Sequence, residues 1–444
     1  MHLYLHVPFC ARRCSYCDFA IAVRKRVPSR AYAEAVLQEW QQWLRRSDAP
    51  DIVGTTADTL YLGGGTPSLL APDELARIVE GLTAHHPLAA GAEVTLEANP
   101  DDVTPERAAA WRALGVGRVS LGVQSFDPAV LTWMHRTHTA EQVAPAVAAL
   151  RGAGISEISL DLIYALPTEV PRDWRRDLEL ALALRPDHLS LYGLTVEAHT
   201  PLAHWVARSE VRGAEDERYA EEFLLADRTL GDAGFEHYEV SNYALPGKRA
   251  RHNSAYWRRA TYIGLGPSAH SAFGRERQWN VREWAAYERA LNEGQTVVGG
   301  RELLDDVALR LEEIYLGLRT IDGIPKDRLP APVVINWVDQ GWAVGSPPVP
   351  VTPSSLTAAS PIPRSSSPPG PLSTASRLTD ITGRISSSPP GPLIGSPRTA
   401  SLPGQRSSSP PGPLSTFVER GSEERVRLTP EGWLRLDALV AMVG

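Results

Sequence analysis

Residues 1–195 alternate six short apolar runs with helical stretches, and this alternation constrains the fold more than any other feature. Each run is rich in Leu, Val, Ile or Tyr and ends near Gly, Pro, Asn or Asp, as strands do. Repeated βα units build a parallel sheet with right-handed crossovers. Both an open six-unit barrel and a doubly wound sheet fit this α/β pattern, and periodicity alone does not choose between them. The predicted strands are 2–7, 59–62, 93–97, 118–122, 156–162 and 188–194, and the predicted helices between them are 29–44, 72–84, 105–114, 140–152 and 171–184.

The chain divides into three predicted regions. Residues 1–300 carry the βα units and their extension, residues 301–345 together with 416–444 form a small C-terminal domain, and residues 346–415 interrupt that domain. The string SSSPPGPL occurs three times in the interrupting region, with a spacing of 21 residues. Because Pro-Pro-Gly-Pro removes backbone donors and blocks helices and strand ladders, we expect a disordered, partly polyproline II insertion. A docking segment of the PxxP type is the functional alternative.

All three cysteines of the chain lie within eight residues, at Cys10, Cys14 and Cys17. An odd number of cysteines in one short segment indicates a metal site and not a disulfide framework. Three thiolates on a 4Fe–4S cluster leave one iron open to another ligand, because the fourth cysteine of a ferredoxin is missing. A zinc ion held by the three cysteines and a histidine such as His6 is the alternative.

The Cys-x3-Cys-x2-Cys spacing after a first strand resembles the signature of the radical S-adenosylmethionine (SAM) superfamily. A second string, Gly63-Gly64-Gly65-Thr66-Pro67, resembles the motif that binds the amino end of SAM in that family. The resemblance implies that SAM chelates the open iron and that the reduced cluster cleaves it to a 5′-deoxyadenosyl radical. It also implies a partial (βα)6 barrel, followed by a small winged-helix-like α+β domain whose two hairpin strands flank the insertion.

Further strings are similar to the subfamily that contains oxygen-independent coproporphyrinogen III oxidases and HemW-type heme chaperones. These strings are EANP at 97–100, GVQSF at 122–126, MHRTH at 134–138 and DLIY at 161–164. Polar residues at the carboxyl ends of parallel strands converge on one cleft, which gives this placement a physical basis of its own. By resemblance, the residues that contact SAM are Tyr4, Tyr16, Gly64, Gly65, Thr66, Glu97, Gln124, Arg136, Asp161, Gly193 and His270.

Three features favour a chaperone over an oxidase. The string HNSAYW at 252–257 resembles HNxxYW of HemW-type proteins, Cys17 is followed by Asp18-Phe19 where oxidases carry a further cysteine, and the chain starts at its first strand. The chaperone reading implies heme as a ligand, with His252 as a candidate axial ligand, and an acceptor protein and a reductant protein as partners. Oxidative decarboxylation of coproporphyrinogen III is the alternative, and modification of RNA or protein by radical SAM chemistry is weaker.

The charge and hydropathy of the chain bound its partners. A net charge of −7 lacks the basic surplus of a nucleic-acid binder. No run of 18 apolar residues predicts a membrane span, although peripheral membrane contact stays open. The first ten residues also lack the basic and apolar regions of a signal peptide. The sequence therefore predicts a cytoplasmic protein.

Overall fold

The computed structural model describes residues 1–46, 55–345 and 424–443. These residues form two compact units, one spanning Met1–Asp322 and the other beginning at Gly323. The predicted insertion at 346–415 lies outside the described residues, as does the start of the segment 416–444.

The larger unit is built on one sheet of twelve described strands in the order β14-β13-β12-β11-β1-β4-β5-β6-β7-β8-β10-β9. The seven neighbours from β11 to β8 pair in parallel, whereas the strands at both edges pair antiparallel. The six predicted strands all form and lie side by side in chain order. The strands are β1 (His2–Val7), β4 (Ala57–Gly64), β5 (Leu88–Ala98), β6 (Arg118–Gln124), β7 (Glu157–Tyr164), β8 (His188–Gly193), β9 (Glu236–Glu239), β10 (Asn242–Ala244), β11 (Tyr262–Leu265), β12 (His270–Phe273), β13 (Glu276–Asn280) and β14 (Val298–Leu303).

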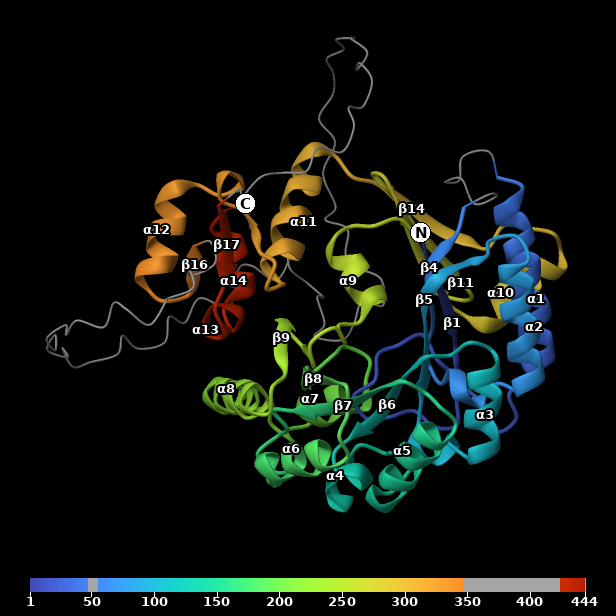
Figure 1. The fold of residues 1–444 in the computed structure, drawn as a ribbon, viewed down its shortest axis with the longest axis horizontal. Helices are drawn as coiled ribbons and strands as arrows, with labels where there is room; N and C mark the ends of the chain where they lie inside the picture. Colours follow the sequence, from blue (N-terminus) through green and yellow to red (C-terminus); the bar gives the residue numbers. More distant parts are fainter. Residues whose placement is uncertain (47–54, 346–423, 444) are drawn as a thin grey trace, which may run out of the picture. The chain divides into compact units, whose positions relative to one another are not determined.

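Helices follow one another around the outside of these strands, from α1 and α2 through α3 and α5 to α6 and α8 (Figure 1). Each crossover helix buries one apolar stripe, as amphipathic helices against a sheet do. For α2 the buried residues are Leu75, Ile78, Val79 and Leu82. The helices are α1 (Ser29–Leu44), α2 (Pro72–Thr83), α3 (Pro105–Ala113), α4 (Pro128–Trp133), α5 (Val143–Gly152), α6 (Trp174–Ala183), α7 (Pro201–Ala207), α8 (Asp216–Asp232), α9 (Arg251–Trp257), α10 (Trp284–Asn292) and α11 (Asp306–Leu318).

Some helices, among them α3, α4 and α6, start at a short polar side chain that accepts a backbone N–H group. Thr104 accepts from the amide of Arg107 at 3.2 Å, and Pro105 follows at the first helical position of α3. Asp127 and Asp173 cap α4 and α6 in the same way. These caps place the end of each preceding loop, and the loops that follow the parallel strands carry the candidate site.

The division between the units falls after Asp322, whereas the sequence predicted it after residue 300. Helix α11 belongs to the larger unit, because Glu312 on its surface pairs with both Arg259 and Arg277. The chain then returns to β9, where the amide of Ile321 donates to the carbonyl of Tyr238 at 3.0 Å. These contacts tie residues 306–322 to the sheet extension.

The second unit has a three-stranded antiparallel sheet in the order β15-β17-β16. Its strands β16 and β17 pair directly and stand on either side of residues 346–423, which lie outside the described residues. The hairpin predicted around the insertion therefore forms. The elements are β15 (Ile324–Pro325), α12 (Ala331–Asp339), β16 (Ala343–Gly345), β17 (Arg425–Leu428), α13 (Pro430–Trp433) and α14 (Leu436–Ala441).

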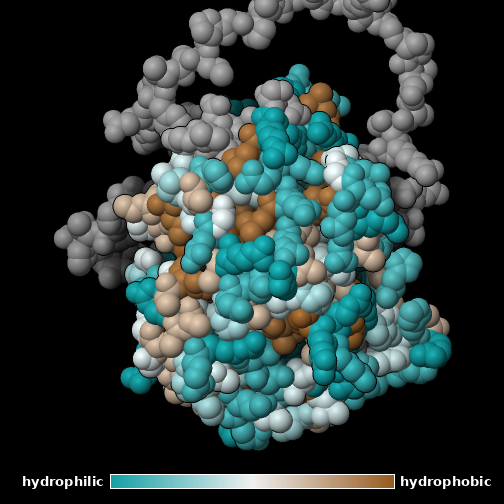
Figure 2. Space-filling view, turned by 90° about the vertical axis from the view of Figure 1, so that its right-hand side faces the viewer, coloured by the Kyte–Doolittle hydropathy of each residue, from teal (hydrophilic) through white to brown (hydrophobic). Residues whose placement is uncertain are grey.

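The surface on the side of α1, α2 and α10 is largely hydrophilic, with separate small apolar patches (Figure 2). Among the described residues, no helix has the length and apolar character to cross a membrane.

Candidate functional site

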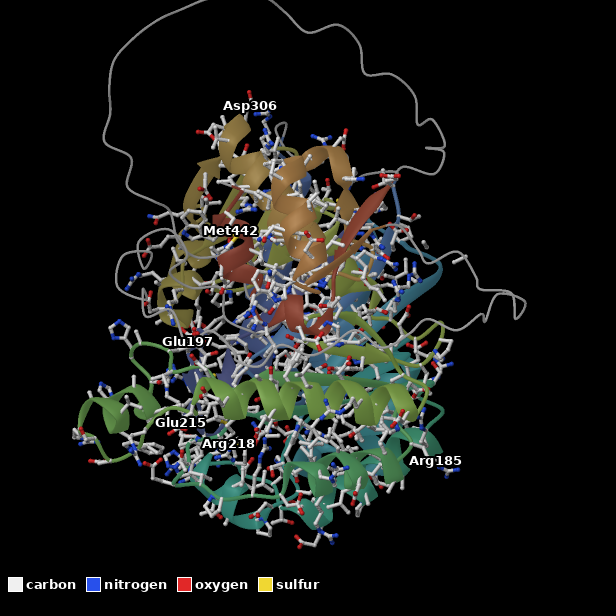
Figure 3. The ribbon with its side chains drawn as sticks, turned by 90° about the vertical axis from the view of Figure 1, so that its left-hand side faces the viewer. Arg185, Glu197, Glu215, Arg218, Asp306 and Met442 are labelled. Carbon is white, nitrogen blue, oxygen red and sulfur yellow. The ribbon has the colours of Figure 1, made fainter. Side chains whose placement is uncertain are left out.

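The candidate site is a cavity of about 200 Å³ in the larger unit. Its lining includes the loops after the parallel strands. It also includes Arg118 and His188, which stand at the amino ends of β6 and β8. Glu197, in the loop after β8, also lines it and is labelled in Figure 3. Twelve of the fifteen predicted site residues line this cavity: Cys10, Cys14, Tyr16, Cys17, Gly64, Gly65, Thr66, Glu97, Gln124, Arg136, Asp161 and Gly193.

The cysteine loop runs between two short strands, β2 (Phe9–Cys10) and β3 (Ala22–Val23), which pair in parallel. The amide of Arg24 donates to the carbonyl of Cys10 at 2.9 Å, and the amide of Ser15 donates to the carbonyl of Met134 at 3.1 Å. The loop is therefore closed at its base and attached at its middle to the segment after α4. All three thiols are partly buried and face one cavity.

Burial raises the pKa of the Cys10 thiol to about 11, although the hydrogen bond from the Thr66 hydroxyl at 3.4 Å opposes this rise. Burial likewise raises the pKa of Cys17 to about 12, and the neighbouring Cys14 adds to the effect. The thiols of Cys10 and Cys17 are therefore protonated at neutral pH when no metal is bound. Metal binding at this loop must displace protons.

The glycines after β4 pack so closely against their neighbours that a side chain would not fit. A Cβ at Gly65 would lie 2.8 Å from the carbonyl oxygen of Phe9 and 3.0 Å from the sulfur of Cys10. Gly64 has φ +110°, a conformation that L side chains rarely adopt, and a Cβ there would lie 2.8 Å from the ring of His6. The backbone therefore approaches the cysteine loop as closely as glycine permits.

Glu97 stands at the end of β5 and braces this glycine turn. Its Oε2 accepts the amide of Gly64 at 2.9 Å, and its Oε1 accepts the hydroxyl of Tyr61 at 2.7 Å. Burial raises the pKa of Glu97 to about 7; the hydrogen bond from Tyr61 lowers it and the charge of Asp161 raises it further. Its carboxyl group therefore accepts or gives up a proton easily near neutral pH.

Asp161 lies deeper, on β7, among the hydroxyl groups of neighbouring strands. Ser120 on β6 donates to its Oδ1 at 2.8 Å. Burial raises the pKa of Asp161 to about 6, and hydrogen bonds from Ser120 and from Ser190 on β8 oppose this rise. The carboxylate is thus held in a polar layer across three strands.

Arg136, in the loop after α4, bridges the cysteine loop and the strand ends. Its Nη2 donates to Asn99 Oδ1 at 2.6 Å and to the carbonyl of Gly122 at 2.7 Å, while its Nη1 lies 3.4 Å from the sulfur of Cys14. Its Nε is buried and has no partner among the described residues. A buried donor without an acceptor is costly, so this nitrogen is available to an anionic ligand in the cavity.

Tyr16 and Gln124 also line the cavity. Tyr16 lines the cavity and also packs against the buried cluster of Val130, Met134, Ile163, Leu166 and Val170. Gln124 ends β6 with φ 66°, which strains a residue with a side chain and turns it toward the cavity wall.

Three predicted residues lie outside the cavity wall. Tyr4 is one layer behind, its ring stacked on Tyr61 and its hydroxyl 3.0 Å from His6 Nδ1. His270 is buried and stacks on Trp279. Tyr4 supports Tyr61, which lines the cavity, whereas neither Tyr4 nor His270 lines it.

His252 is buried, with 1% of its surface exposed. Its Nδ1 lies 2.6 Å from the hydroxyl oxygen of Thr59, and its Nε2 lies 2.7 Å from that of Tyr256. Both ring nitrogens are engaged, so this conformation offers none to an iron. The expected role of His252 as an axial heme ligand is therefore not supported, and its neighbour Asn253 lines the cavity instead.

Several residues that line the cavity were not among the predicted site residues, including Asn99, Ser120, Ser190 and Asn253. The sequence does contain a pattern that could have predicted the two serines. Each is a small polar residue in the middle of an otherwise apolar strand, and buried polar groups at such places need partners across the sheet. Ser120 pairs in register with Ser159, and Asp161 with Ser190.

The donor set is three thiols from one loop. Each cysteine of a 4Fe–4S cluster binds a different iron, so three cysteines leave one iron for another ligand. The three thiols, the closely packed glycine turn and the unpartnered nitrogen of Arg136 together fit a cluster with a small anionic ligand beside it.

The radical SAM superfamily model matches residues 4–181. A heme chaperone HemW of Mycobacterium tuberculosis (strain ATCC 25618 / H37Rv) is 40% identical over 333 residues, which cover 74% of this chain and 84% of the relative. HemW of Synechocystis is 35% identical, with 74% and 80% covered. The chain belongs to the HemW family of radical SAM proteins.

Membership of the superfamily assigns a 4Fe–4S cluster and SAM as cofactors. Among solved structures, the chain is similar to the radical SAM coproporphyrinogen III oxidase HemN of Escherichia coli, with a TM-score of 0.66 and 21% identity. That similarity covers 77% of this chain and 84% of HemN. The structural similarity confirms the predicted fold, a partial barrel of βα units. At 21% identity it shows the fold and not the activity.

Proposed function

We propose that this chain is a heme chaperone that binds heme and a SAM-ligated 4Fe–4S cluster and transfers the heme to an acceptor protein. The observation that carries the proposal is a single cavity that joins Cys10, Cys14 and Cys17 to the glycine turn and to Arg136, in a chain closely related to proteins named as heme chaperones. The proposal includes a reductant protein for the cluster and a cytoplasmic location.

In this proposal the three cysteines hold the cluster, and the open iron takes the amino and carboxylate groups of SAM. Bound in this way, the reduced cluster supplies one-electron cleavage of SAM. The glycine turn at Gly64 and Gly65 would let the amino end of SAM lie close to the backbone, and the unpartnered Nε of Arg136 would be a donor for its carboxylate. The other predicted SAM contacts that line the cavity are Tyr16, Thr66, Glu97, Gln124, Asp161 and Gly193.

The expected alternative is an oxygen-independent coproporphyrinogen III oxidase. In the oxidases, the third cysteine of the motif is usually followed, two positions later, by a further cysteine. Here that position is Phe19, which lines the cavity. The likeness to HemN extends to the fold and carries no activity to this chain.

The test of the proposal is anaerobic heme binding by protein with a verified cluster. Hemin titration of this protein should give a saturable change in the Soret band, and mixing with a heme-free b-type cytochrome as probe acceptor should move the heme to that acceptor. Cys14→Ser should lose cluster iron, which tests the ligand assignment separately. If protein with full cluster iron shows no saturable heme binding, the chaperone proposal fails.

A further inference from the structure

The surface around the cysteine loop is strongly basic in a chain that is acidic overall. The net charge of the chain is −7, yet residues 1–33 contain six arginines and lysines and one acidic residue, Asp18. Excess charge of one sign concentrated in one short segment of a chain with the opposite net charge indicates a binding surface for an oppositely charged partner.

The fold brings these charges to the edge of the cluster site. The parallel pairing of β2 and β3 sets Val23 opposite Cys10, and the amide of Arg24 donates to the carbonyl of Cys10 at 2.9 Å. The basic string Arg24-Lys25-Arg26 therefore begins beside the first cysteine, although fourteen positions separate Cys10 from Arg24 in the sequence.

The basic side chains are exposed and mostly unpaired. Arg12, Arg24, Lys25 and Arg26 are exposed, and none of them forms an ion pair with any residue that the structure describes. Only Arg30, farther along, is paired, with Glu34 at 3.1 Å. An exposed charge without an ion-pair partner in the described chain is available to a partner of opposite charge.

Two further groups extend this surface. Arg282, in the loop before α10, is exposed and donates to the backbone carbonyl of Asp18 at 3.0 Å, so it adds positive charge from a distant part of the chain. Val23 is 45% exposed between the basic groups. A charged rim around an apolar centre is the usual anatomy of a transient protein interface. We call Arg12, Val23, Arg24, Lys25, Arg26 and Arg282 the basic rim.

We propose that the basic rim is the docking surface for an acidic one-electron donor protein. The inference rests on the proposed function, because it assumes that Cys10, Cys14 and Cys17 carry the cluster. A cluster at this loop gains an electron from outside the protein, and electron transfer slows steeply with distance. A donor bound on Arg24 and Lys25 sits as close to the cysteine loop as the surface allows, and opposite charges speed its encounter.

The test compares two reductants on the same reconstituted protein. The variant Arg24→Glu/Lys25→Glu/Arg26→Glu reverses the rim without touching the cavity wall, and Arg175→Glu/Arg176→Glu, which reverses two exposed arginines near the start of α6, is the matched control. Stopped-flow absorbance would follow cluster reduction by a reduced flavodoxin, an acidic protein donor, and by the reduced methyl viologen cation. The viologen needs no docking surface.

With flavodoxin, the rim variant should be reduced at least tenfold more slowly than the wild type at low salt, and the wild-type rate should fall as salt rises. With viologen, a cation that the basic rim repels, the rim variant should be reduced at least as fast as the wild type, and the control variant should behave as the wild type with flavodoxin. An unchanged flavodoxin rate in the rim variant would overturn the inference.

Two other outcomes are distinguishable. If the rim variant keeps the wild-type flavodoxin rate but loses binding to phosphatidylglycerol vesicles, the rim is a membrane surface and the donor inference is wrong. A wild-type protein without cluster iron or sulfide would overturn the proposed function itself, and the docking inference with it.

Discussion

The guanidinium of Arg136 touches the cysteine loop and the strand ends at once, with Nη1 3.4 Å from the sulfur of Cys14 and Nη2 2.6 Å from Asn99 Oδ1. Its Nε has no partner among the described residues. One side chain therefore fixes the distance between the cluster loop and the end of β5, and it still has a donor to offer a ligand.

Replacing this arginine with lysine tests its role toward SAM. Arg136→Lys keeps the charge but loses the planar fork of donors, so the SAM dissociation constant should rise about tenfold or more while cluster iron stays at the wild-type level. Arg112→Lys, at an exposed position of α3, is the matched control. Equilibrium binding of SAM to the reconstituted protein measures the effect, and wild-type affinity in Arg136→Lys would refute the assignment.

Gly65→Ala tests the close approach of the glycine turn to the cysteine loop. The new methyl group would lie 2.8 Å from the carbonyl of Phe9 and 3.0 Å from the sulfur of Cys10, so the loop must shift. We expect less than half of the wild-type iron and sulfide after reconstitution. Gly152→Ala, where a Cβ meets nothing within 4 Å, should load normally. Full cluster content in Gly65→Ala would show that the cysteine loop can move to accommodate the methyl group, and it would contradict the prediction.

Replacing His252 with alanine tests whether this residue stabilises the fold or binds heme iron. In His252→Ala the hydroxyls of Thr59 and Tyr256 lose a buried partner, which should lower the free energy of unfolding by roughly 1–3 kcal/mol. The Soret band of the heme complex should keep its position. Denaturant unfolding and hemin titration measure the two effects. A changed Soret band with unchanged stability would return His252 to the coordination sphere of the heme.

The buried carboxyl of Glu39 predicts a pH dependence of stability. It accepts the amide of Gly266 at 2.8 Å and the hydroxyl of Tyr287 at 2.5 Å. Burial raises its pKa to about 7, against which the hydrogen bonds from Gly266, Tyr287 and Asn280 act. Between the ordinary glutamate pKa, about 4.3, and about 7, the folded state therefore holds a proton that the unfolded state has lost.

Stability should consequently fall as pH rises through that window, by about 3 to 4 kcal/mol from this group, and then level off. Glu39→Gln removes the titrating group, so its free energy of unfolding should change less between pH 5 and pH 7 than that of the wild type. Urea unfolding at both pH values gives the comparison. Equal slopes in the two proteins would mean that Glu39 does not titrate in this range.

The parallel core and most of the cavity could be predicted because their signals are local. Glu97 and Gln124 stand at the ends of apolar runs, and a parallel sheet brings such ends to one edge. The cysteine spacing and the glycine turn are likewise read from a few adjacent residues.

The rest depends on contacts between distant segments. Strand β11 lies in parallel beside β1, where Leu3 pairs with Ile263. The sequence around either residue does not predict this pairing. The same holds for His252, whose motif drew attention to heme while its ring is held by Thr59, 193 positions away. The boundary after Asp322 depends on ion pairs between α11 and the sheet extension, which no local pattern predicts.

The measurement that tests the central claim most directly is an anaerobic turnover assay on reconstituted protein with SAM, a reductant and coproporphyrinogen III. Porphyrin products and 5′-deoxyadenosine would be quantified in the same tube, after the cluster has been shown to respond to SAM. The account predicts no decarboxylated porphyrin, together with saturable heme binding by the same preparation. Formation of protoporphyrinogen would make the chain an oxidase and contradict the chaperone function.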